Sequence, residues 1–204
     1  MVLEHLIRHG VAAEGLDAFP EAVRACRDWT GGRVWLADAR RLPFSEEFDA
    51  IGLFDCPEHI LEDDAVLAGV RRALCPQVVV FLTVPAELRL WSQVDIASGH
   101  FRRYAKSELT AKLHSAGLEI LKLSHNNLLV LLFYWLHRFW LLPLLSRLRG
   151  ASTASVEKAL RVPPVFLNEL LYRLMRSERW LLQRGALPYG ASLLVVPRRP
   201  SESR

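Results

Sequence analysis

The chain has 204 residues, of which 51% are apolar and 24% are charged, so it is long enough for one globular domain with a sizeable core. This composition, without low-complexity tracts, excludes a disordered or fibrous protein. Cys26, Cys56 and Cys75 show no CxxC spacing, which favours a reduced cytoplasmic protein over a disulfide scaffold. We recognise no signal peptide, because charged side chains interrupt residues 1–20.

Charge is distributed unevenly along the chain. Residues 1–137 hold 14 Lys/Arg and 18 Asp/Glu, a net charge of −4, whereas residues 138–204 hold 12 and 4, a net charge of +8. This asymmetry indicates a polyanionic partner for the C-terminal part, either a membrane surface or nucleic acid, unless the basic residues form a solvated face.

The N-terminal part of the chain reads as alternating helices and strands. Residues 2–9 have the pattern of a helix end that Gly10 terminates. Pro20 opens a second helix that runs to about Trp29, since proline is tolerated in a first helical turn. Strands are expected at 11–17, 33–38 and 48–55, the last apolar enough to be buried on both faces.

The same alternation continues after residue 60. An amphipathic helix is expected at 63–74, starting at an Asp cap, and another at 106–117, with Ser107 as its cap and Gly117 as its stop. Further strands are expected at 77–85, 118–124 and 191–199. Strands and helices at this spacing predict a doubly wound, mostly parallel α/β sheet.

Three predicted strands end in an acidic residue, namely Asp17, Asp38 and Asp55. Ligands of parallel α/β sheets bind beyond the carboxyl ends of the strands. We therefore expect these carboxylates on one rim, forming a polar pocket for a ligand rich in hydroxyl and amino groups.

Residues 127–150 are strongly apolar but contain His137 and Arg138, with Pro143 further on. A spanning helix needs about 20 largely uncharged residues, and an arginine in its middle costs about 2.5–3.5 kcal/mol. We therefore expect a lid or an interfacial helix pair at the inner membrane face, with a buried core helix as the alternative.

A further helix, rich in Leu and Arg, is expected at 165–184. We divide the chain into three parts. An α/β domain comprises residues 1–125 and 190–199, and a helical insertion, which is membrane-peripheral in this interpretation, comprises residues 126–189. Residues 200–204 form a basic tail.

Several motifs then occur in a fixed order over about residues 10–125: EGLDAFPEAV, LADARRLPF, FDCPEHI and GHFRRY. This run resembles the class I S-adenosylmethionine-dependent methyltransferases, closest to the bacterial branch that acts on small molecules. The resemblance implies a Rossmann-like methyltransferase sheet, S-adenosylmethionine as cofactor and methyl transfer as the activity.

The resemblance also implies residue roles. Asp17 would accept hydrogen bonds from both ribose hydroxyls, and Asp38 from the adenine amine, since carboxylates are acceptors only. Either residue alone would equally suit a turn or cap. The implied cofactor-binding residues are Asp17, Ala18, Asp38, Ala39, Leu42, Asp55 and Cys56.

Two loops carry the candidate catalytic and substrate-binding residues. The resemblance places His59 in the PEHI turn beside Glu58, and His100 would act as a general base on an acceptor hydroxyl. The implied substrate-binding residues are Trp91, His100, Arg102, Arg103 and Tyr104. The alternative is that His59 is structural and that the Arg-Tyr segment pins its loop to the domain. We expect no metal site.

The family's first strand ends in a glycine-rich D-x-G-x-G-x-G loop, a motif that the 204 residues do not contain. In the family's strand order 3-2-1-4-5-7-6 that strand is central, so the strands at 11–17 and 48–55 would have no partner between them. Unpaired buried backbone is costly. We therefore expect a sheet that closes the gap, borrows a strand through oligomerisation or is weakened. Two hypotheses explain the missing loop: either the sequence is truncated at its N-terminus, or the protein is a degenerate methyltransferase.

The sequence thus predicts a methyltransferase acting on a small or lipid-like acceptor, with peripheral membrane contact. The alternative is a catalytically inactive module of the same fold that binds a membrane or a partner. No nucleic-acid partner is expected, because neither a basic stripe interleaved with aromatic residues nor a base-flipping signature is found.

Overall fold

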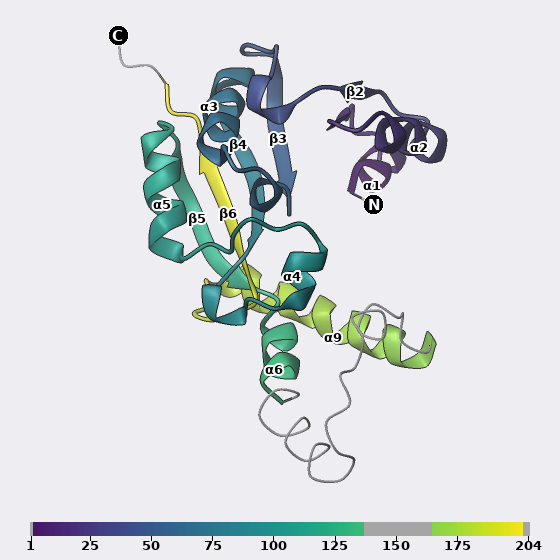
Figure 1. The fold of residues 1–204 in the computed structure, drawn as a ribbon, viewed down its shortest axis with the longest axis vertical. Coiled ribbons are helices and arrows are strands. Elements are labelled where there is room, and N and C mark those ends of the chain that lie inside the picture. Colours follow the sequence, from purple (N-terminus) through teal and green to yellow (C-terminus); the bar gives the residue numbers. More distant parts are fainter. Residues whose placement is uncertain (1, 137–164, 202–204) are drawn as a thin grey trace.

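The computed structural model describes residues 2–136 and 165–201, in which the strands form two sheets (Figure 1). In the first, β1 (Gly15–Asp17) pairs in parallel with β2 (Val34–Leu36). The second has the spatial order β3-β4-β6-β5. Its strands are β3 (Phe48–Phe54), β4 (Leu74–Pro85), β6 (Ser192–Arg198) and β5 (Glu119–Asn126).

The α/β class is confirmed, but the sheet is mixed. β3 pairs in parallel with β4, whereas β6 runs antiparallel to both β4 and β5. The expectation of a mostly parallel sheet is therefore confirmed in part, since β3, β4 and β5 share one direction and β6 runs against them. The chain reaches β6 directly from helix α9 (Val165–Arg184), which lies at the end of the sheet where β5 finishes, so β6 runs back in the opposite direction (Figure 1).

The helices lie close to their expected positions. α1 (Val2–Arg8) is followed by Gly10 at φ 76°, and α2 (Pro20–Thr30) ends at Gly31, at φ 64°. Glycine adopts these left-handed conformations without a steric penalty. The remaining α-helices are α3 (Asp63–Ala73), α4 (Gln93–Ala97), α5 (Lys106–Ser115) and α6 (Leu128–Leu136), and the short 3₁₀ helices are η1 (Ala39–Arg41), η2 (Pro57–His59) and η3 (Leu88–Leu90).

Two expected helix caps are wrong. α3 begins at Asp63 itself, and its N-cap residue Glu62 makes no side-chain cap bond. The Asp63 carboxylate is turned into the protein instead. α5 is preceded by Ala105 rather than capped by Ser107, and it stops before Gly117 at φ 72°. The stop was predicted because it depends on local backbone conformation alone.

The core lies where α3 and α5 pack against the four-stranded sheet. Apolar side chains at helical spacing, such as Val66 and Val70 on α3 and Leu109 and Leu113 on α5, are at most 2% exposed. They meet buried residues of β4 and β6, among them Leu82 and Val195. This core fixes the position of the loops that follow β3 and β4.

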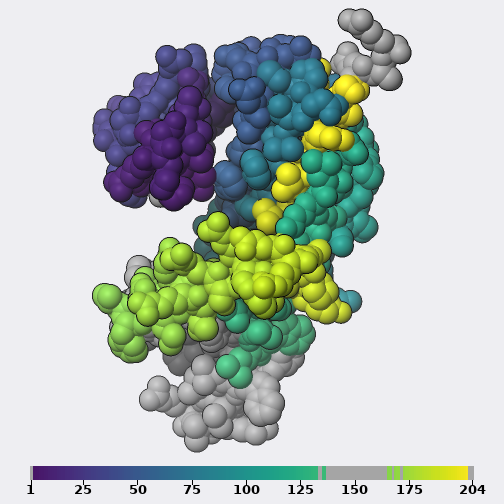
Figure 2. All heavy atoms as spheres, turned by 180° about the vertical axis from the view of Figure 1, so that it is seen from behind, coloured from purple at the N-terminus to yellow at the C-terminus, as the bar shows by residue number. Residues whose placement is uncertain are grey.

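β3 is not buried on both faces as expected, since Leu53 is its one buried residue and Phe54 is 43% exposed. Among the described strands β3 is an edge strand that pairs with β4 alone, and β1 does not pair with it. Figure 2 shows an open gap between the N-terminal unit, in purple, and the body of the second sheet. The sheet is therefore interrupted between β1 and β3.

α6 and α9 lie at the end of the second sheet where β5 finishes (Figure 1). Glu178 of α9 is buried, and its carboxylate accepts from the Leu128 backbone N–H at the start of α6, at 3.1 and 3.2 Å. His137, Arg138 and Pro143, which motivated the lid interpretation, lie outside the described residues. Within the described residues, no helix combines the length and hydrophobicity that crossing a bilayer requires.

Candidate functional site

The first part of the site is the rim formed by Asp17, Asp38 and Asp55. Asp17 is the last residue of β1, Asp38 precedes η1, and Asp55 directly follows β3. Asp55 has φ 49°, a left-handed conformation that aspartate tolerates better than most residues. Its N–H donates to the Thr83 carbonyl at 3.0 Å, and the Thr83 hydroxyl donates to its carboxylate at 3.2 Å. Cys56 directly follows this turn.

Asp17 lies near Cys56 across the interrupted sheet. Burial raises the pKa of the Cys56 thiol to about 11, and the charges of Glu58 and Asp17 add to the effect. The thiol is therefore protonated at neutral pH. The Asp17 carboxylate accepts from the Phe19 N–H at 2.9 Å and is half-buried, whereas Ala18 is exposed.

Asp38 is engaged by a neighbouring cation. Its Oδ1 accepts from the Arg40 backbone N–H at 2.9 Å, and its Oδ2 from Arg40 Nη2 at 2.7 Å. The hydrogen bonds from Arg40 lower the pKa of Asp38 to about 2. Ala39 and Leu42 pack towards Gly69 of α3. An adenine amine at Asp38 would share the carboxylate with Arg40, which already donates to both oxygens.

The second part of the site is the turn that follows Cys56, where η2 places Glu58 and His59. Glu58 is fully buried, and neither of its carboxylate oxygens has a hydrogen-bond partner within the described part of the chain. Burial raises its pKa to about 7; its own backbone N–H and the charge of Arg103 oppose this shift, and the charge of Asp55 adds to it. The exposed His59 ring packs edge-on against His100, with centroids 4.7 Å apart.

His100 is oriented by a residue that was not among the predicted site residues. Its Nδ1 lies 3.0 Å from Asp95 Oδ1, and Asp95 is 1% exposed. Asp95 also accepts from Arg103 Nε at 2.8 Å and from the Ser92 N–H at 2.8 Å. The Ser92–Asp95 pair forms a capping box on α4. The S-x-x-D spacing of Ser92 and Asp95 is the sequence signal by which Asp95 could have been found.

Arg102 and Tyr104 point inward and contact Asp63. Arg102 Nη1 donates to Asp63 at 2.9 Å, and the Tyr104 hydroxyl donates to it at 2.8 Å. Tyr104 is 1% exposed. These contacts favour the interpretation in which the Arg-Tyr segment pins its loop to the domain. Trp91, at the end of η3, is half-buried.

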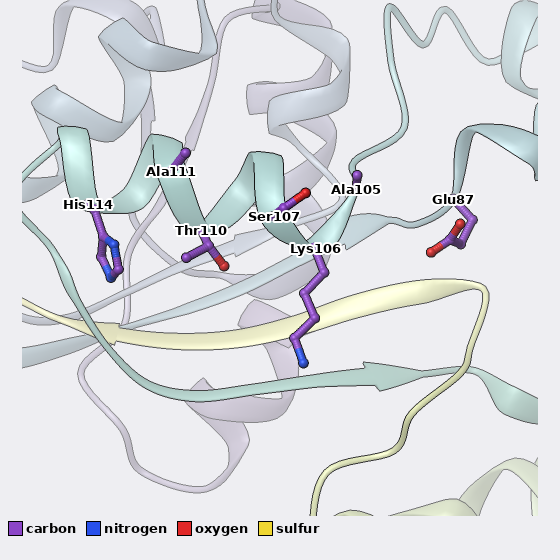
Figure 3. A pocket seen from close by; sticks show the side chains of 7 residues that line it. All are labelled: Glu87, Ala105, Lys106, Ser107, Thr110, Ala111 and His114. Atoms are coloured by element: carbon purple, nitrogen blue, oxygen red, sulfur yellow. The ribbon is translucent and has the colours of Figure 1, made fainter.

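A shallow hollow elsewhere on the surface is separate from these residues. It lies along α5, with Glu87 beyond the N-terminal end of that helix (Figure 3). None of the predicted site residues lines it. Its lining residues are Glu87, Ala105, Lys106, Ser107, Thr110, Ala111 and His114.

Residues 1–123 match a family described as a methyltransferase domain. The chain belongs to this family. The class I S-adenosylmethionine-dependent methyltransferase predicted from the sequence is thus confirmed at the level of family, fold and cofactor class. No curated protein matches the sequence.

Solved structures of methyltransferases share the fold at low identity. The methyltransferase in complex with the Trm112 activator of Haloferax volcanii is 16% identical, with a TM-score of 0.62, covering 98% of this chain and 77% of that one. A SAM-dependent methyltransferase from Archaeoglobus fulgidus is 15% identical, with a TM-score of 0.59, covering 97% and 80%. One from Thermotoga maritima is 12% identical, with a TM-score of 0.60, covering 95% and 75%.

Proposed function

We propose that this methyltransferase binds S-adenosylmethionine along the rim of Asp17, Asp38, Asp55 and Cys56 and transfers its methyl group to a small or lipid-like acceptor. The supporting observation is the proximity of Asp17 to Cys56, which is close enough for the carboxylate charge to act on the thiol. The residue implied for the ribose and the residue implied for the reacting methyl group thus occupy one rim, although their strands do not pair.

The chemistry requires little from the protein beyond alignment. A sulfonium is already an activated methyl donor, so holding acceptor, methyl carbon and sulfur in line supplies most of the rate. An acceptor hydroxyl or amine also has to lose a proton. His100 suits this role, because its bond with Asp95 fixes one ring nitrogen and leaves Nε2 for the acceptor.

Calorimetry with S-adenosylhomocysteine tests the cofactor site. Replacing Asp17→Asn is expected to weaken binding about 10–100-fold, because hydrogen bonds to a charged acceptor contribute about 1.5–3 kcal/mol. Glu21→Gln is the matched control, since Glu21 is an exposed carboxylate on α2 whose partner is Arg24. The cofactor proposal fails if the unchanged chain releases no heat, or if the two variants bind equally well.

An apolar and basic surface on α9 supports the lipid-like acceptor and the membrane contact. Large side chains such as Phe166 and Trp180 are 76% and 55% exposed. The same helix carries several arginines, and Arg184 lies over the Trp180 ring at 3.4 Å from its centroid. Exposed apolar residues together with arginines are typical of helices that lie in the interface of an anionic bilayer.

Flotation with vesicles of anionic phospholipid tests this contact. The chain is expected to float with such vesicles at low salt and to be released at high salt. Trp180→Ser is expected to reduce binding about tenfold, because burying a large apolar side chain contributes about 1.5–3 kcal/mol. Trp29→Ser, at a position on α2 that is 64% exposed, is the control and should bind unchanged. Equal binding by both variants would exclude α9 as the contact surface.

The alternative function, a membrane- or partner-binding module without catalysis, is favoured by one observation. The Asp38 carboxylate already accepts hydrogen bonds from Arg40, with which a ligand would compete. Vesicle binding combined with no heat from S-adenosylhomocysteine would support this alternative over the enzyme.

A further inference from the structure

Glu58 is an unusual residue in this fold. It is 0% exposed, and both of its carboxylate oxygens are buried without a hydrogen-bond partner in the described part of the chain. A buried carboxyl group without a partner is costly, and native proteins satisfy such groups with hydrogen bonds, protons or metal ions. The carboxylate therefore requires a compensating group.

Two imidazoles stand beside this carboxylate. One ligand atom each from Glu58, His59 and His100 lies within 4.8 Å of the other two. Zinc binds such atoms at about 2.0–2.2 Å in tetrahedral coordination, so two of its ligand atoms lie about 3.3–3.6 Å apart. The set therefore has to contract by up to about 1.4 Å. The exposed His59 side chain can supply this movement by rotating towards the other two.

His100 has the outer contact that metal-binding histidines commonly have. Its Nδ1 contacts the buried Asp95 carboxylate at 3.0 Å, which leaves Nε2 as the nitrogen available to a metal ion. Such carboxylate–histidine pairs orient the ring and raise its basicity as a ligand. The loop is also held in place, because the Phe101 N–H donates to the Glu58 carbonyl at 2.8 Å.

We propose that Glu58, His59 and His100 bind one divalent transition-metal ion of the zinc type. Two imidazole nitrogens and one carboxylate oxygen suit zinc better than magnesium or calcium, which prefer oxygen ligands. Three protein ligands leave a fourth position open for water or for an oxygen or nitrogen of a small molecule. Metal binding does not require methyl transfer, but a metal-bound His100 Nε2 no longer has a free lone pair and cannot act as the general base considered above.

A competing pair of histidines has to be controlled. His5 and His9 on α1 are exposed, one helical turn apart, and their ring centroids lie 4.1 Å from each other. Two imidazoles at this spacing bind transition metals on a helix face. His5→Ala/His9→Ala is therefore the matched control, and the chain should carry no histidine tag.

The test is a zinc titration of the full chain after metals have been removed with EDTA. Calorimetry measures zinc binding, and the melting temperature measures the stabilisation by zinc. The unchanged chain is expected to bind one equivalent at this site and to melt at a higher temperature with zinc. Glu58→Gln and His59→Ala are each expected to weaken this binding at least tenfold. His59 is exposed, so its variant keeps the fold. With Co²⁺, the unchanged chain should show the visible absorption of a four-coordinate ion.

The His5→Ala/His9→Ala variant should keep that equivalent and the Co²⁺ absorption. The proposal is overturned if the unchanged chain binds no zinc, if both cluster variants bind zinc like the unchanged chain, or if the helix α1 variant alone abolishes binding. These results do not depend on S-adenosylhomocysteine, so they remain distinguishable from failure of the proposed methyltransferase function.

Discussion

Replacing Asp63 by alanine is expected to lower the free energy of unfolding by about 3–5 kcal/mol, the cost of removing one partner from a buried charge cluster. Asp63 is 1% exposed and joins α3 to the GHFRRY loop and to α5. Its carboxylate accepts from Arg102 Nη1 at 2.9 Å, Tyr104 Oη at 2.8 Å and Lys112 Nζ at 3.0 Å. Without it, the buried Tyr104 hydroxyl loses its partner, and Arg102 and Lys112 each lose one of their contacts.

Asp64→Ala is the matched control for this prediction. Asp64 is the next residue of α3 and also contacts Lys112 at 3.0 Å, but its side chain is 71% exposed. Exposed ion pairs contribute about 0–1 kcal/mol. Urea unfolding followed by circular dichroism measures both variants. If Asp63→Ala costs no more than Asp64→Ala, the cluster does not hold the loop in place.

Glu58 is expected to make the protein less stable as pH rises. Burial raises its pKa from 4.5 to about 7, although its own backbone N–H and Arg103 oppose the shift; Asp55 adds to it. The imidazoles of His59 and His100 face the same carboxylate. Because the folded state holds the proton more tightly than the unfolded state, this contribution is fully present below about pH 4.5 and is lost as pH rises through about 7. The loss amounts to about 3 kcal/mol.

The Glu58→Gln variant removes this titration while keeping the size of the side chain. The stability of the variant minus that of the unchanged chain should therefore increase by about 3 kcal/mol between pH 4.5 and 8. Urea unfolding in the presence of EDTA at several pH values measures the difference without interference from metal ions. A difference that stays constant with pH would show that folding does not shift the pKa of Glu58.

Sequence reasoning predicted the strand ends more accurately than the side-chain contacts around them. Asp17 ends β1 and Asp55 directly follows β3, as expected, whereas Asp38 lies two residues beyond the end of β2. The engagement of Asp38 by Arg40 was not foreseen. Their spacing of two residues permits the pair, but only the conformation of η1 determines that it forms.

The burial of β3 and the partners of the GHFRRY loop could not be predicted either. An apolar strand is buried only if other elements cover it, and the gap beside β3 leaves Phe54 exposed. Arg102 and Tyr104 meet Asp63, which lies far away in the sequence. Such contacts depend on how α3 packs against the loop, which no local pattern encodes.

The sequence by itself determined the alternation of strands and helices, the family, and the helix stops at Gly10 and Gly117, because periodicity, motif order and backbone conformation are local properties. The tertiary structure alone decided three things: the antiparallel direction of β6, the interrupted sheet, and the meeting of Glu58 and His59 with His100. Each of these depends on segments distant in sequence, and their burial and pairing are set only when the chain has packed around its core.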